Sequence, residues 1–179
     1  MTEPATSISI LLIDDEALIR AGLRALLELE GFRVVGEAGE ARGGIRLAGE
    51  FHPDIVVLDI AMPGMSGLDA VAPIKKASPA TKVVIASQHE GHSYVRQALE
   101  AGADGYLSKA SDPQDLRAAI EAVSSGESFL SPRLAGTFAA GSHADGLVPA
   151  TGLRLDRLTP REREVFQLIA VGRANKEIA

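Results

Sequence analysis

The chain has 179 residues, of which 46% are hydrophobic and 23% charged, and it contains no cysteine and no tryptophan. The lack of cysteine excludes a disulfide framework and a thiolate metal site, and a formal net charge of -6 disfavours nonspecific nucleic-acid binding by the chain as a whole. No signal-like leader is visible, and no apolar run approaches the roughly 20 residues of a membrane-spanning helix. We therefore expect a cytoplasmic protein that does not contact a membrane, with one main domain and a smaller unit.

Five short apolar segments predict buried strands: Ile8 to Ile13, Arg33 to Ala38, Ile55 to Leu58, Lys82 to Ser87 and Gly105 to Ser108. Helical spacing of apolar residues fills the intervals between and after them: Leu18 to Leu27, Glu40 to Glu50, Ser66 to Ala77, Gly91 to Ala101 and Asp112 to Ser124. Strands that alternate with helices predict right-handed βαβ crossovers. The expected fold class is α/β, a doubly wound (βα)5 parallel sheet with helices on both faces.

Local signals mark helix boundaries and a change of composition. Gly31 is a stop signal for the first helix, and Asp112 followed by Pro113 predicts the start of the fifth. After Ser124 the sequence turns to Ser, Gly, Ala and Pro, which is typical of a linker. Helical signals resume with a capping box that begins at Thr159. We expect a first domain over 7–126, a linker over 127–157 and an incomplete all-α segment over 158–179.

Acidic side chains follow two of the predicted strands. Asp14 and Asp15 come directly after the first strand, and Asp59 follows the third. The carboxyl ends of parallel strands meet at one edge of a sheet, where ligands bind, so these carboxylates should converge. Clustered carboxylates repel one another unless a cation joins them, and oxygen ligands of this kind suit Mg²⁺. On its own, the Asp14-Asp15 pair reads equally well as a turn and helix N-cap.

Two further polar residues lie at the same predicted edge. Ser87 closes the fourth strand and Lys109 follows the fifth. With these groups present, Asp59 would accept a phosphoryl group while Asp15 binds Mg²⁺ directly and Asp14 binds it through water. Lys109 would neutralise the remaining charge, and Ser87 would donate its hydroxyl to a phosphoryl oxygen.

Together these positions resemble the receiver domain of bacterial response regulators, from about Ser7 to Gly126. The matching motifs are Ile13-Asp14-Asp15-Glu16, Val57 to Gly67, Ala86-Ser87 and Ala101 to Lys109. The resemblance implies the flavodoxin-like strand order and phosphotransfer from a sensor histidine kinase to Asp59. It also implies that Ser87 and Tyr106 move together on activation, and that Mg²⁺ contacts the backbone carbonyl of Ala61.

The end of the sequence resembles a second family. Leu158 to Val165 and Asn175 to Ala179 are similar to the start of a LuxR-type helix-turn-helix, which indicates the NarL/FixJ group of transcriptional regulators. In that family the recognition helix lies beyond the segment that matches Ala179, so we expect no DNA-reading residue here. DNA would be bound only through the complete output domain, and the resemblance implies a homodimer on activation. The apolar face of Val165, Leu168 and Ile169 would dock on the receiver or linker, pair between chains or be mobile.

The sequence departs from the usual receiver pattern near the predicted site. Ala61 offers no polar side chain to an attacking water, and His89 carries an imidazole two residues after Ser87. Both are candidates for tuning the phosphoryl lifetime, in a direction that the sequence leaves open. Lys109-Ala110 stands where many receivers have Lys-Pro with a cis bond, which is also left open. Considered one by one, His89, His92 and His143 read as solvated surface residues and His52 as a loop residue.

Three functions compete on this reading. The favoured one is a two-component response regulator that is not an enzyme beyond its own phosphorylation and dephosphorylation. An aspartyl phosphatase would need a general-acid carboxylate two residues after its nucleophile, where the chain has Ala61. The third is an interaction module that works without phosphorylation, in which beryllofluoride with Mg²⁺ would leave Ser87 and Tyr106 unchanged.

Overall fold

The structure is a computed structural model that describes residues 7–135. Six parallel strands form one sheet in the order β2-β1-β3-β4-β5-β6. The strands are β1 (Ser9–Ile13), β2 (Arg33–Ala38), β3 (Ile55–Leu58), β4 (Lys82–Ser87), β5 (Gly105–Ser108) and β6 (Phe129–Leu130). The helices are α1 (Ala17–Leu29), α2 (Ala41–Phe51), α3 (Gly67–Ala77), α4 (His92–Ala101) and α5 (Pro113–Ser124), and residues 132–135 are also helical.

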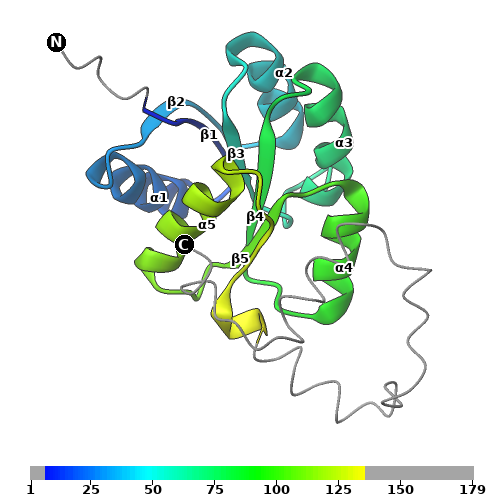
Figure 1. Ribbon diagram of the computed structural model, residues 1–179. Coiled ribbons are helices and arrows are strands. Elements are labelled where there is room, and N and C mark those ends of the chain that lie inside the picture. The colour runs from blue at the N-terminus through cyan, green and yellow to red at the C-terminus, as the bar shows by residue number, and fades with distance from the viewer. Residues whose placement is uncertain (1–6, 136–179) are drawn as a thin grey trace, which may run out of the picture.

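Helices cover both faces of the sheet, so the molecule has three layers (Figure 1). On one face α1 and α5 pack against alternate strand residues such as Ile10 and Leu12. On the other face α2, α3 and α4 enclose a larger core with Leu11 and Ile13. Because both faces are buried, the central strands read as continuous apolar runs, and this is why the sequence signals them clearly.

The strand order confirms the doubly wound sheet and the flavodoxin-like arrangement of its first five strands. A sixth strand, β6, was not predicted, and it lies inside the range assigned to the linker. Phe129 and Leu130 are 2% and 5% exposed. They pair with β5, the backbone N–H of Phe129 donating to the carbonyl of Asp104 at 3.2 Å. Two residues are too few to show strand periodicity, and burial against β5 is what orders them.

Helix boundaries follow the sequence signals to within two residues. Gly31, with φ +86°, follows α1 in the left-handed region that glycine adopts without strain. Pro113 begins α5 as predicted, but Asp112 makes no side-chain capping hydrogen bond. In residues 7–135 no peptide bond is cis, so the bond between Lys109 and Ala110 is trans.

Several sequence-based expectations lie outside the described residues. These are the helix-turn-helix segment over 158–179, its apolar face, the linker after residue 135 and His143. Within the described part, no helix combines the length and the apolar character needed to cross a membrane.

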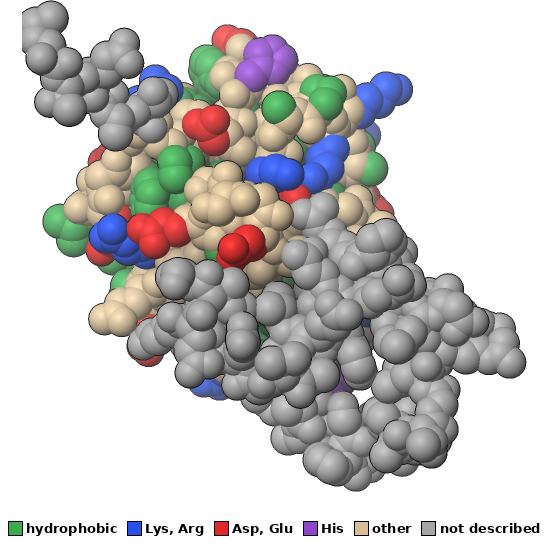
Figure 2. Space-filling view, viewed as in Figure 1, with side chains coloured by type: hydrophobic (Ala, Val, Ile, Leu, Met, Phe, Trp, Pro, Cys, Tyr) green, Lys and Arg blue, Asp and Glu red, His purple; other side chains and the backbone are tan. Residues whose placement is uncertain are grey.

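The surface carries charges of both signs. On the face shown in Figure 2, acidic and basic side chains lie interspersed among hydrophobic ones. Many pair along one helix at i,i+4, including Arg24 with Glu28 and Arg96 with Glu100. Exposed pairs of this kind contribute only about 0.3–0.5 kcal/mol each, so the stability of the fold rests on its two apolar cores.

Candidate functional site

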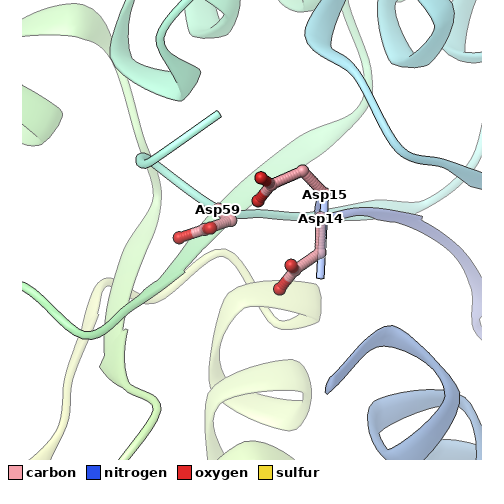
Figure 3. Close-up of side chains that lie close together, drawn as sticks. All are labelled: Asp14, Asp15 and Asp59. Atoms are coloured by element: carbon pink, nitrogen blue, oxygen red, sulfur yellow. The ribbon is translucent and has the colours of Figure 1, made fainter. Parts of the chain in front are cut away.

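Sheet register brings the three aspartates together. β1 and β3 are neighbours, with Ile13 opposite Leu58, so the residues that follow each strand emerge side by side. The backbone N–H of Asp59 donates to the carbonyl of Ile13 at 2.9 Å, which continues the ladder by one step. Figure 3 shows the resulting group of carboxylates at the ends of the two strands.

One carboxylate oxygen from each of Asp14, Asp15 and Asp59 lies within 4.8 Å of the others. Asp14 and Asp59 are 2% and 3% exposed, whereas Asp15 faces solvent. One oxygen of each buried carboxylate is held by a backbone N–H: Asp14 Oδ1 by Glu16 and Asp59 Oδ1 by Ile60, both at 2.8 Å. Asp14 Oδ2 is buried and is contacted by the Lys109 ammonium at 2.7 Å rather than by a backbone N–H. The all-oxygen donor set of the three carboxylates fits a hard cation such as Mg²⁺.

Lys109 supplies positive charge to the cluster. Its Nζ lies 2.7 Å from Asp14 Oδ2, 3.2 Å from Asp59 Oδ2 and 3.2 Å from Glu16 Oε1. The backbone N–H of Lys109 donates to the carbonyl of Ser87 at 2.9 Å, which ties it to the end of β4. Burial lowers the pKa of Lys109, but the neighbouring carboxylates outweigh burial, so the pKa stays above its ordinary value. The side chain is therefore a fixed cation.

The ionised form of Asp59 is destabilised in the folded protein. Burial raises the pKa of Asp59, the contact with Lys109 opposes that rise, and the net direction is upward. Nearby Asp14 raises the pKa of Asp59 further by charge repulsion. A bound cation would relieve both penalties.

Ser87 and Tyr106 meet at one residue of the loop between β4 and α4. Both side chains are fully buried. Ser87 Oγ accepts a hydrogen bond from the backbone N–H of His89 at 3.2 Å, and the Tyr106 hydroxyl donates to the His89 carbonyl at 2.6 Å. The structure therefore links the two predicted switch residues through a single backbone unit, with the Tyr106 ring inside the molecule.

The burial of Tyr106 predicts a high-pH transition. Burial raises the pKa of Tyr106 to about 12 from 10.0, although the nearby Ser87 hydroxyl opposes the rise. Because the folded state holds this proton more tightly, stability should be full below pH 10.0 and fall as the pH rises to about 12. Titration of tyrosinate absorbance should show this component in the wild type and lose it in Tyr106→Phe. A Tyr106→Phe titration identical to that of the wild type would contradict the assignment.

The two residues singled out for rate tuning both line a cavity of about 370 Å³ that opens onto Asp59. Ala61 is exposed there. His89 is partly buried, and its ring stacks on Tyr94 with ring centroids 4.4 Å apart. His52 ends α2 in the left-handed region, and its Nδ1 lies 3.1 Å from Ser78 Oγ.

Sequence reasoning missed two polar residues at this cavity, Glu16 and Gln88. Glu16 contacts Lys109, and Gln88 Nε2 donates to Glu16 Oε1 at 3.4 Å. The available signal was an acidic residue that directly follows the Asp14-Asp15 pair.

Comparison with known proteins decides the family. The family described as "Response regulator receiver domain" matches residues 10–121, and "Bacterial regulatory proteins, luxR family" matches residues 156–179. The chain belongs to the response regulators of the LuxR family. It is a two-component response regulator with a receiver and a helix-turn-helix output region that regulates transcription.

Relatives of this LuxR-family response regulator cover nearly the whole chain. It is 40% identical over 178 residues to the nitrate/nitrite response regulator NarL of Escherichia coli K12, covering 99% of this chain and 80% of that protein. It is 37% identical to the transcriptional regulatory protein LiaR of Bacillus subtilis, covering 96% of this chain and 80% of the relative. By their names both relatives are regulatory proteins.

Solved structures support the fold of the regulator. A LuxR-family response regulator from Aurantimonas sp. SI85-9A1 superposes with a TM-score of 0.73 at 39% identity, covering 77% of this chain and 99% of that one. The receiver domain of the response regulator NarL from Mycobacterium tuberculosis gives a TM-score of 0.65 at 33% identity, covering 68% and 98%.

Proposed function

We propose that Asp59 is the phosphoryl acceptor of this response regulator and that a sensor histidine kinase in the cytoplasm is the donor. The observation that carries the proposal is the buried Asp59 carboxylate, which opens into a cavity and lies 3.2 Å from the ammonium of Lys109. A carboxylate oxygen would attack phosphorus, forming an O–P bond while the bond from phosphorus to the kinase imidazole breaks. The imidazole nitrogen leaves with the electron pair. Lys109 offsets the charge that this transfer brings into the site.

Asp14, Asp15 and Asp59, with the backbone carbonyl of Ala61, would hold Mg²⁺ in this proposal. The ion would supply charge neutralisation between the acceptor carboxylate and the incoming phosphoryl group. The fit is supported by the all-oxygen donor set, in which one carboxylate oxygen of each aspartate lies within 4.8 Å of the others. Mg²⁺ and the Lys109 ammonium would together oppose the charge of the dianionic group.

Ser87 and Lys109 would contact the phosphoryl oxygens, and Ser87 with Tyr106 would report their arrival. Ser87 Oγ accepts a hydrogen bond from the backbone N–H of His89 in the structure, which leaves its O–H free to donate to a phosphoryl oxygen. The Tyr106 hydroxyl donates to the carbonyl of His89. A movement of Ser87 would therefore move His89 and Tyr106 and change the surface made by β5 and α4. A changed surface changes partners, which would drive homodimerisation and DNA binding by the complete output domain.

Ala61 and His89 are proposed to set the lifetime of the phosphoryl group. Both line the cavity through which a hydrolytic water must approach Asp59. Ala61 has no polar group to orient that water. The His89 ring, which is held by stacking on Tyr94, would restrict the movement of the water. Ala61 also counts against an aspartyl phosphatase, because it provides no general acid.

Beryllofluoride, which mimics an acyl phosphate, tests the switch. With Mg²⁺ it should shift the NMR signals of Ser87 and Tyr106 and make the protein elute earlier in size exclusion; beryllofluoride without Mg²⁺ is the control. Unchanged spectra would favour an interaction module that works without phosphorylation. Shifted spectra with unchanged elution would refute dimerisation on phosphorylation but not the switch at Ser87 and Tyr106. Steady turnover of a small phosphate ester would favour the phosphatase.

A further inference from the structure

The ammonium of Lys109 is shared by three carboxylates that differ in burial. Asp14 and Asp59 are 2% and 3% exposed, whereas the side chain of Glu16 is 46% exposed. Glu16 stands at the N-cap of α1 but makes no side-chain capping hydrogen bond. Its carboxylate instead contacts Lys109 and accepts the hydrogen bond from Gln88 across the cavity. The backbone N–H of Glu16 donates to Asp14 Oδ1 at 2.8 Å, which fixes the position of this residue.

An ammonium group has three N–H donors, and each of the three carboxylates can take one. A phosphoryl oxygen on Asp59 needs one of those donors, so one existing contact must be given up. The contacts of Lys109 with Asp14 and Asp59 are buried, and a buried ion pair is costly to break. Loss of the contact to Glu16 costs little, because water reaches its carboxylate. Glu16 is therefore the contact that the phosphoryl group displaces.

We propose that Glu16 is a positioning residue that holds Lys109 toward the mouth of the cavity and releases it when the phosphoryl group arrives. The inference rests on the proposed phosphorylation of Asp59. Glu16 also lines the cavity through which the donor enters, so its negative charge opposes an anionic donor. Both effects slow phosphorylation, and removing the Glu16 carboxylate speeds it.

The full chain with Glu16→Gln tests the inference, because glutamine keeps the size of the side chain and removes its charge. The rate of Asp59 phosphorylation by acetyl phosphate with Mg²⁺ should rise roughly three- to tenfold, as expected for removing one exposed charge near an anion. The gain should shrink as the ionic strength increases.

Two further variants separate position from charge. Glu100→Gln makes the same charge change on α4, where Glu100 pairs with Arg96, and it should keep the wild-type rate. Glu16→Asp keeps the charge but shortens the side chain so that it loses Lys109, and it should speed phosphorylation as well. A wild-type rate in both Glu16 variants overturns the inference, and a gain in Glu16→Gln alone overturns the positioning role. Failure of the wild type to become phosphorylated would instead refute the proposed function.

Discussion

Replacement of Asp59 by asparagine is expected to abolish phosphorylation of the protein completely. An amide oxygen is a far weaker nucleophile than a carboxylate, so the substitution removes the acceptor that lies 3.2 Å from Lys109 Nζ. Intact mass after incubation with acetyl phosphate and Mg²⁺ should show one added phosphoryl group on the wild type and none on Asp59→Asn. Asp69→Asn, an equal change at an exposed position in the first turn of α3, should be labelled like the wild type.

The same variant should remain folded, and its pH dependence tests this. Burial leads the causes that raise the pKa of Asp59 above 3.8, so its ionised form weakens the folded state. The stability that Asp59 contributes is full below pH 3.8 and is lost as the pH rises through its folded pKa. Without Mg²⁺, Asp59→Asn should therefore be more stable than the wild type at pH 7, and the gap should close on acidification. Chemical denaturation at several pH values measures the difference.

Two results would contradict these expectations. Labelling of Asp59→Asn would move the acceptor to another carboxylate, with Asp14 and Asp15 as the nearest ones. A variant less stable than the wild type at pH 7 would mean that the contact between Asp59 and Lys109 outweighs the burial of the carboxylate. In that case loss of labelling alone would not separate lost chemistry from lost structure.

The parts of the site that the sequence predicts are those that follow from strand register. Asp14 and Asp59 succeed apolar runs that lie side by side in the sheet, so the pattern of residues fixes their meeting. Ser87 and Lys109 follow in the same way from β4 and β5, whose last residues pair in register. Each of these residues lies within one position of a strand end, where the backbone leaves little freedom.

Contacts that depend on the direction of a side chain could not be predicted from the sequence. Glu16 had two local uses, as a helix cap or as a partner for a distant lysine, and only the path of the loop after β5 decides between them. The depth of Tyr106 likewise depends on the space between β5 and α4, where its hydroxyl reaches the carbonyl of His89. Neither contact leaves a periodic pattern in the chain.

A side chain at Gly67 is expected to destabilise the protein strongly, because α3 begins directly against the strand end that bears Asp59. The backbone N–H of Gly67 donates to the carbonyl of Ile60 at 3.0 Å. A Cβ atom at Gly67 would lie 1.9 Å from the carbonyl oxygen of Asp59, which is backbone and cannot rotate away. Gly67→Ala should therefore lower the free energy of unfolding by about 1–3 kcal/mol or more, the cost of overpacking a closed site. Denaturant titration measures the loss.

Gly22→Ala is the matched control, since a Cβ at this position in α1 meets no atom within 4 Å. Alanine is favoured over glycine inside a helix, so this variant should gain roughly 0.5–1 kcal/mol of stability. The opposite signs separate the loss of space at Gly67 from the general effect of replacing glycine. Because the clash falls on the peptide of Asp59, Gly67→Ala should also slow phosphorylation under conditions where it is folded. A folded Gly67→Ala with wild-type stability and rate would show that α3 can retreat from the strand without moving the acceptor.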